Sequence, residues 1–145
     1  MTDPVAQWFI DLCRELFQLE TKYGYTVSKL SCRHVEIVWR LKKGDHEIVV
    51  MEECIETFGV PTIQFWPLNR KEIFGLHEAL PALDPKHDAK RPKDVSYAMT
   101  REQLRALLEH WAEFFHAHAK ELLEDHHETF LAVKNFRKTK PDPYP

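Results

Sequence analysis

The stretch His34–Met51, HVEIVWRLKKGDHEIVVM, decides the fold of this chain. Its first half alternates apolar with other residues, the apolar set being Val35, Ile37, Trp39 and Leu41. Lys43-Gly44-Asp45 then supplies a turn, and His46–Met51 continues as a second extended run. A period of two on both sides of a short turn is typical of a β-hairpin. We therefore place an antiparallel pair of strands at the centre of the fold.

Further strands are expected on both sides of this hairpin. Residues 25–30 alternate weakly, and Gly59–Leu68 (GVPTIQFWPL) has the composition of a strand. Because proline cannot donate a ladder hydrogen bond, the latter strand should lie at an edge or start and stop at Pro61 and Pro67. Trp39 and Trp66 are expected to serve the core more often than to form binding platforms.

The N-terminal segment has the period of a helix. Asp3-Pro4 predicts its start, because an acid caps the first amides and proline suits the first helical position. Gly24 predicts its end. The stripe that faces the core recurs at steps of three and four and consists of Val5, Trp8, Phe9, Leu12, Cys13, Leu16 and Leu19.

Helices are also expected after the strands. Capping boxes at Asn69–Glu72, at Thr100–Gln103 and at Asp125–Glu128 predict three helix starts. The proline-bearing stretch 81–99 is expected to be a long loop. The order predicts a single α+β domain over residues 1–137. It has an N-terminal amphipathic helix, a small antiparallel sheet of three to four strands and C-terminal helices on one face. Residues 138–145 are expected to form a disordered tail.

Composition excludes several functional classes. The 145 residues carry 43% hydrophobic side chains and a formal net charge of −3, which suits one core but not a general nucleic-acid binder. No apolar run approaches the roughly 18 residues of a membrane span, and the N-terminus lacks the pattern of a signal peptide. Cys13, Cys32 and Cys54 are sparse and odd in number, so we expect reduced thiols in a cytoplasmic protein.

Histidines crowd the segment His110–His127, HWAEFFHAHAKELLEDHH. A helical metal pair needs two histidines four residues apart, and no two of these five have that spacing. The pairs Glu113–His116 and Glu124–His127 are half of a di-iron motif, but such motifs lie on facing helices. On a helical wheel His118 falls within the apolar stripe, His110 on its shoulder and His116 toward solvent.

No phosphate-binding loop or nucleophile motif occurs, so neither catalysis nor a cofactor is expected. A set of acids around the third strand is the candidate partner-binding site, since it could steer a basic protein. This set consists of Asp45, Glu47, Glu52, Glu53 and Glu56.

Two segments of the chain resemble a known family. Tyr23-Gly24-Tyr25 ends the first helix, and the C-terminal helical segment carries Leu107, Leu108, Trp111, Ala112, Phe115, Leu122, Leu123, Asp125 and Phe130. This arrangement resembles small immunity proteins of bacterial polymorphic-toxin systems. The resemblance implies a cytoplasmic protein that neutralises one cognate toxin by covering its active site or blocking its assembly.

Two alternatives stay open. The chain could be an effector adaptor or chaperone that holds another protein chain in an apolar groove. It could also be a metal-dependent enzyme that uses Glu113, His116 or His118. No nucleic-acid or membrane partner is expected under any of these hypotheses.

Overall fold

The computed structural model describes residues 3–33, 35–54, 56–67 and 71–139. The chain runs from one helix through five strands to a group of helices. In order these are α1 (Pro4–Phe17), β1 (Thr26–Arg33), β2 (Glu36–Lys43), β3 (His46–Glu53), β4 (Thr62–Trp66), β5 (Phe74–Gly75), α2 (Leu76–Leu83), α3 (Pro85–Asp88), α4 (Arg101–Ala117), α5 (Ala119–Leu123) and α6 (His126–Thr139).

The strands form one antiparallel sheet in the order β1-β2-β3-β4-β5. The α+β class is therefore confirmed, with more strands than the three to four expected. The hairpin of β2 and β3 pairs Lys43 with His46 across the turn, where Gly44 has a φ of 60°. The additional strand, β5, has only two residues and pairs through Gln64–Gly75 and Phe65–Phe74. A strand this short leaves no alternation to read in the sequence.

The bounds of β4 agree with one of the two placements that its prolines allow. It begins directly after Pro61 and ends directly before Pro67, as the second alternative for this segment required. It does not lie at an edge, because it pairs with β3 on one side and with β5 on the other. The two edges of the sheet are β5, with two residues, and β1, with eight.

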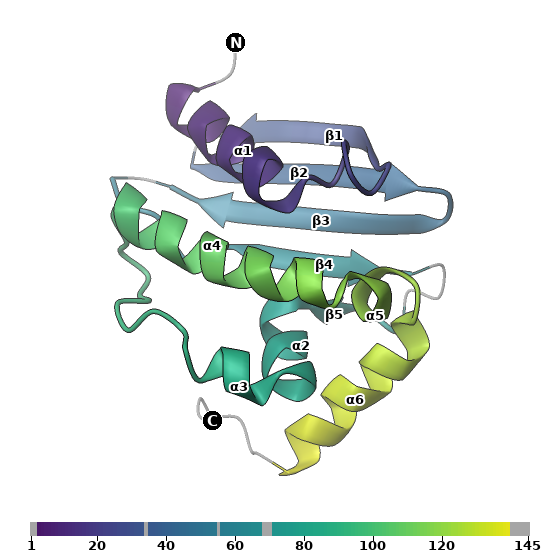
Figure 1. Ribbon diagram of the computed structural model, residues 1–145. Coiled ribbons are helices and arrows are strands. Elements are labelled where there is room, and N and C mark those ends of the chain that lie inside the picture. The colour runs from purple at the N-terminus through teal and green to yellow at the C-terminus, as the bar shows by residue number, and fades with distance from the viewer. Residues whose placement is uncertain (1–2, 34, 55, 68–70, 140–145) are drawn as a thin grey trace.

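The core lies between the sheet and a layer of helices. α1 and α4 run across one face of the sheet, and α2, α3 and α6 gather beyond β5 (Figure 1). Phe115 of α4 is buried among the rings of Phe17, Tyr23 and Phe65, with ring centroids 5.1–6.2 Å apart. These contacts join α1, the segment that follows it and β4 to one aromatic centre.

α1 begins as the sequence predicts and ends earlier. The Asp3 carboxylate accepts a hydrogen bond from the Val5 amide at 2.7 Å. The helix ends at Phe17 and not near Gly24, because Gln18 adopts a left-handed φ of 53° and its amide bonds back to Arg14. Gly24 has its own positive φ of 77° in the connection to β1.

The segment after β4 differs from its prediction. The capping box expected at Asn69–Glu72 includes residues outside the described part of the chain, and the helix itself starts later, at Leu76. Its cap is Gly75, whose amide donates to Glu78. The expected loop at 81–99 contains the end of α2, with Pro81 inside it, and the short helix α3.

The C-terminal helices begin where two of the capping boxes predict. Thr100 caps α4 through a reciprocal pair with Gln103, and α6 begins at His126 directly after Asp125. The helical wheel treats His118 as part of a continuous helix, but α4 ends at Ala117, because His118 leaves helical geometry with φ −119° and ψ 25°. α6 continues to Thr139, so two residues of the expected tail are helical; residues 140–145 lie outside the described part.

Within the described residues, no helix combines the length and the apolar character that crossing a bilayer requires.

Candidate protein-binding surface

One face of the sheet carries no helix in the described part of the chain (Figure 1). The register identifies the side chains that project from this face of the three central strands. Strand alternation puts Ile48 and Val50 toward the helices and Val49 on the opposite side. We call this uncovered surface the open face, and it consists of Val38, Arg40, Glu47, Val49, Met51, Gln64 and Trp66.

A chain of polar and aromatic contacts orders the open face. The Arg40 guanidinium pairs with the Glu47 carboxylate at 3.2 Å and lies 5.5 Å from the centroid of the Trp66 ring. The Trp66 indole N–H donates to Gln64 at 3.0 Å. Val49, between these side chains, is only 1% exposed although no helix covers it. The side chains therefore form a continuous, pre-organised layer.

The residue types of the open face match those of protein interfaces. Tryptophan, arginine and methionine are enriched at interface centres, and tryptophan and arginine dominate binding hot spots. Trp66, Arg40 and Met51 are each half-buried and remain accessible from this side. The expectation that Trp66 serves the core is wrong, whereas Trp39 is fully buried as expected.

The five predicted binding acids do not form one surface. Glu52 is 2% exposed and faces the core, while Glu47 is 5% exposed and paired with Arg40 on the open face. Asp45, Glu53 and Glu56 are exposed. Asp45 and Glu53 stand at opposite ends of β3, roughly 26 Å apart at the usual rise per residue. Glu47 and Glu52 are thus unavailable as freely accessible steering charges.

Glu52 is the most unusual of these acids. One carboxyl oxygen accepts the Glu53 amide at 2.7 Å, and the other is buried without a hydrogen-bond partner. Burial, with a smaller effect of the Glu53 charge, raises the pKa of this carboxyl to about 8 against the opposing effect of the backbone hydrogen bond. Glu52 is therefore mostly protonated at neutral pH. The alternation Ile48, Val50, Glu52 was the sequence signal for this inward orientation.

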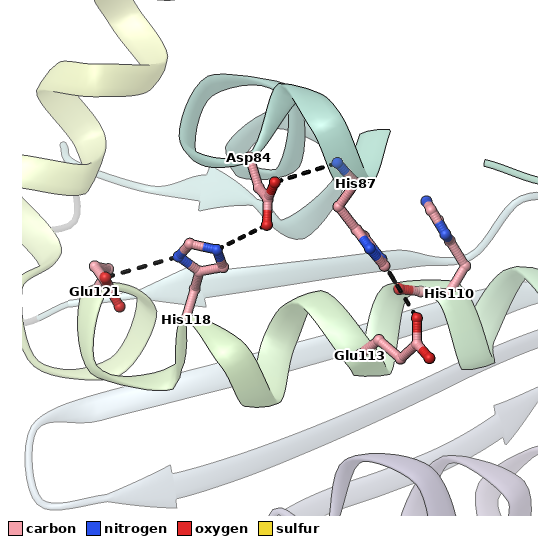
Figure 2. A network of polar contacts seen from close by, with 6 residues as sticks. All are labelled: Asp84, His87, His110, Glu113, His118 and Glu121. Atoms are coloured by element: carbon pink, nitrogen blue, oxygen red, sulfur yellow. Dashed lines mark hydrogen bonds and ion pairs between the residues drawn. The ribbon is translucent and has the colours of Figure 1, made fainter. Parts of the chain in front are cut away.

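Asp84 and His118 are at the centre of a polar network between α3 and the junction of α4 with α5 (Figure 2). The Asp84 carboxylate accepts from the His87 amide at 3.2 Å and contacts His118 Nε2 at 3.0 Å. The other ring nitrogen of His118 lies 3.7 Å from Glu121. The Asp84 carboxylate that contacts His118 belongs to the cap of α3 and not to the sheet. Both nitrogens face carboxylates, so this histidine clamps two helical segments.

His87 continues this network toward the middle of α4. Its ring stacks on His110 with centroids 4.1 Å apart, and its Nε2 bonds the His110 carbonyl at 2.7 Å. Figure 2 shows Glu113 on the same side, 4.0 Å from the His87 ring. Burial is the main reason that the pKa of His110 is lowered, and the charge of His87 adds to it. The stacked pair packs α3 against α4.

His116 has a different role from the one that the helical wheel predicts. Its Nε2 donates to the Leu16 carbonyl at 2.7 Å, and its Nδ1 lies 2.7 Å from the Tyr23 hydroxyl. It is half-buried, so its expected orientation toward solvent is wrong. The bond to Leu16 satisfies a carbonyl in the last turn of α1, where carbonyls lack partners within the helix.

The two histidines of the metal-enzyme hypothesis face different parts of the molecule. His116 turns toward α1, whereas His118 turns toward Asp84. Among the described residues, no group of three or more histidine, cysteine, aspartate or glutamate side chains is placed to hold a metal ion. The spacing argument that separated these histidines onto different sides of the helix therefore agrees with their placement.

The hollow where α4 ends is a weaker binding candidate than the open face. It has a volume of about 390 Å³ and is lined by Tyr23, Tyr25, Lys43, His46, Ala119, Lys120, Leu123 and Glu124. Its lining mixes two ammonium groups with one carboxylate, which gives no clear charge preference. A void in the core has a volume of about 10 Å³, about the space of a single water.

The clamp at Asp84 can be tested by Asp84→Ala. We expect a drop of a few degrees in Tm, because α3 loses its cap and His118 loses a carboxylate partner. The bond to His118 is the main cause of the lowered pKa of Asp84. Its stabilising effect is thus present above the ordinary carboxyl pKa and is lost as the pH falls through the lower folded value. Asp94→Ala, at an exposed loop position, is the control. Equal Tm values for the two variants would contradict the clamp.

Comparison with family models, with curated proteins and with solved structures finds no match to this chain.

Proposed function

We propose that this chain is an immunity-type binding protein that neutralises a cognate bacterial toxin domain without catalysis of its own. The observation that carries the proposal is the open face, an ordered layer without helical cover among the described residues, on which the Arg40 guanidinium lies against the Trp66 ring. The resemblance of Tyr23-Gly24-Tyr25 and of the C-terminal helical pattern to immunity proteins supports it.

A preformed surface of this kind suits tight inhibition. Arg40, Glu47, Gln64 and Trp66 already hold one another in place, so a partner would bind without ordering them. Binding therefore loses less side-chain entropy than it would on a mobile surface. The mechanism is occlusion. The open face covers the active site of the toxin, and the toxin is inactive for as long as the complex lasts.

The direct test is co-expression with the toxic domain of a neighbouring secreted protein. The wild-type chain should restore growth of cells that produce this domain, and the two proteins should co-purify. Co-purification with a neighbour that is not toxic would favour the adaptor hypothesis instead. Absence of both rescue and complex would refute the proposal.

Trp66→Ala tests the surface. We expect a loss of affinity of at least about 30-fold, because an interface tryptophan is a typical hot spot and contributes about 2 kcal/mol or more. Isothermal titration with the purified toxin domain measures it. Tyr97→Ala is the matched control, since Tyr97 is an aromatic residue 86% exposed in the loop before α4. Equal affinity for Trp66→Ala and wild type, with both folded, would move the binding site away from the open face.

A further inference from the structure

β1 is the free edge of the sheet. It has eight residues and pairs only with β2 among the described strands, so alternate amides and carbonyls point away from the sheet. The opposite edge, β5, has two residues and leads directly into α2. A ladder for a further strand is therefore available at β1 and not at β5.

The side chains of β1 are unusually accessible for a strand. Seven of its eight residues are exposed and one is half-buried. The exposed fractions of Val27 and Leu30 are 38% and 41%, and Val35 in the following turn is 38% exposed. Three of the five large hydrophobic side chains that are exposed in the described chain thus lie along this edge. Val27 and Leu30 therefore leave apolar surface accessible beside the unpaired backbone.

The charged side chains of β1 have one sign, and Glu36 of β2 is an acid opposite Arg33. Thr26–Arg33 contains Lys29 and Arg33 but no acid. The register pairs Lys29 with Arg40 and Arg33 with Glu36, so both cations project on the side of the open face. Lys42 of β2 is exposed on the same side. We call Lys29, Arg33 and Lys42 the basic edge.

A second copy of this chain is a poor occupant for this edge. Two β1 strands side by side would bring four cations together, and like charges on neighbouring strands are destabilising. The register also shifts between Val27 and Lys29, and a bulge with lysine is a known protection against self-pairing. A partner strand with acidic side chains is not repelled by these cations. If it pairs over Lys29–Arg33, it also avoids the bulge between Val27 and Lys29.

We propose that β1 receives an extended acidic segment of the partner protein as a sixth strand. Its backbone would pair with the free side of β1, its acids would face the basic edge, and its apolar residues would cover Leu30. Main-chain bonds provide affinity in such strand addition, and the alternate side chains provide specificity. This inference rests on the proposed function, since it names the chemistry of the bound partner. It replaces the expected basic partner by an acidic one.

The experiment uses the full chain and two synthetic eight-residue peptides, one alternating Glu with Val and the other alternating Lys with Val. Backbone amide shifts are followed during titration. The acidic peptide should cause saturable shifts concentrated in β1 and β2, and the basic peptide should bind at least about tenfold more weakly. High salt should weaken the acidic complex.

A charge-reversed variant, Lys29→Glu with Arg33→Glu, should reverse this preference. Its matched control is Lys134→Glu with Lys138→Glu, which makes the same charge change at exposed positions of α6. This control should keep the preference for the acidic peptide. Absence of shifts at β1 with the acidic peptide, or an equal loss in both variants, would overturn the proposal.

The same variants separate this inference from the proposed function. If Trp66→Ala abolishes toxin binding and the β1 charge reversal leaves it unchanged, strand addition is refuted and the immunity function stands. If the wild-type chain fails to rescue cells or bind any neighbour, the proposed function fails, whatever the peptides do at β1.

Discussion

Glu52→Gln is expected to stabilise the protein by about 3–5 kcal/mol above pH 8, and to change its stability little below pH 4.5. Glutamine keeps the oxygen that accepts the Glu53 amide and removes the ionisable proton. The other carboxyl oxygen of Glu52 is buried without a partner, so its ionised form has little to offset the loss of water.

The direction of this effect follows from the raised pKa. Below its ordinary value of 4.5, Glu52 is protonated in both the folded and unfolded states, so its titration contributes nothing. As the pH rises, the unfolded chain releases the proton while the folded chain holds it until about pH 8. The wild-type protein therefore loses stability over this interval, and the loss is constant above it.

Urea unfolding at pH 5, 7 and 9 measures the difference between the variant and the wild type. The control is Glu56→Gln, which removes an acid at an exposed loop position. For the control we expect a small difference that does not grow with pH. A difference for Glu52→Gln that is the same at all three pH values would show that the buried carboxyl does not titrate as inferred.

His126→Leu should stabilise the protein at acid pH, by about 2–3 kcal/mol at pH 4 relative to pH 8. The His126 ring is 7% exposed and packs against His46 and Phe74, with centroid distances of 4.8 and 5.6 Å. Burial, with a smaller effect of the neighbouring His46, lowers its pKa to about 4 against the opposing effect of Glu72. Leucine fills similar space without a group to protonate.

The sign here is opposite to that of Glu52. Above its ordinary pKa of 6.5, His126 is neutral in both states and has no effect. As the pH falls, His126 is protonated near pH 6.5 in the unfolded chain but only near pH 4 in the folded chain. The wild-type protein is thus progressively destabilised over this interval.

The adjacent histidine is a built-in control. His127 lies 2.7 Å from Glu72, and this contact is the main cause of its raised pKa. Its contribution is present below pH 6.5 and is lost as the pH rises through the folded value. His127→Leu should therefore lose stability relative to the wild type at acid pH, where His126→Leu gains. Shifts in the same direction for both variants would contradict this assignment.

Much of the fold could be predicted because its signals are local. The alternation in His34–Met51 predicts the β2–β3 hairpin, and the caps at Asp3, Thr100 and Asp125 predict three helix starts. β5 was missed because two residues are too few for a period. The end of α4 at Ala117 was not predicted because His118 lies inside an apolar stripe that continues past it.

The candidate surface was less predictable than the fold. Alternation already separates Glu47, on one side of β3, from Glu52, on the other, so an acidic patch containing both was inconsistent with the strand that carries them. The same alternation places Val38 and Arg40 together on one side of β2. It does not say which side the helices cover, and Trp66 was therefore assigned to the core.

The sequence by itself determined where α1, α4 and α6 start, the central hairpin and the α+β class, because these follow from the period of apolar residues and from caps within a few positions. The tertiary structure alone decided which sheet face stays open, that Glu52 is buried and that β1 is the free edge. It also decided that Asp84 clamps His118 and that Tyr23 holds His116, across 34 and 93 positions of the chain. Such contacts depend on which elements pack together, and no local pattern of residues records that choice.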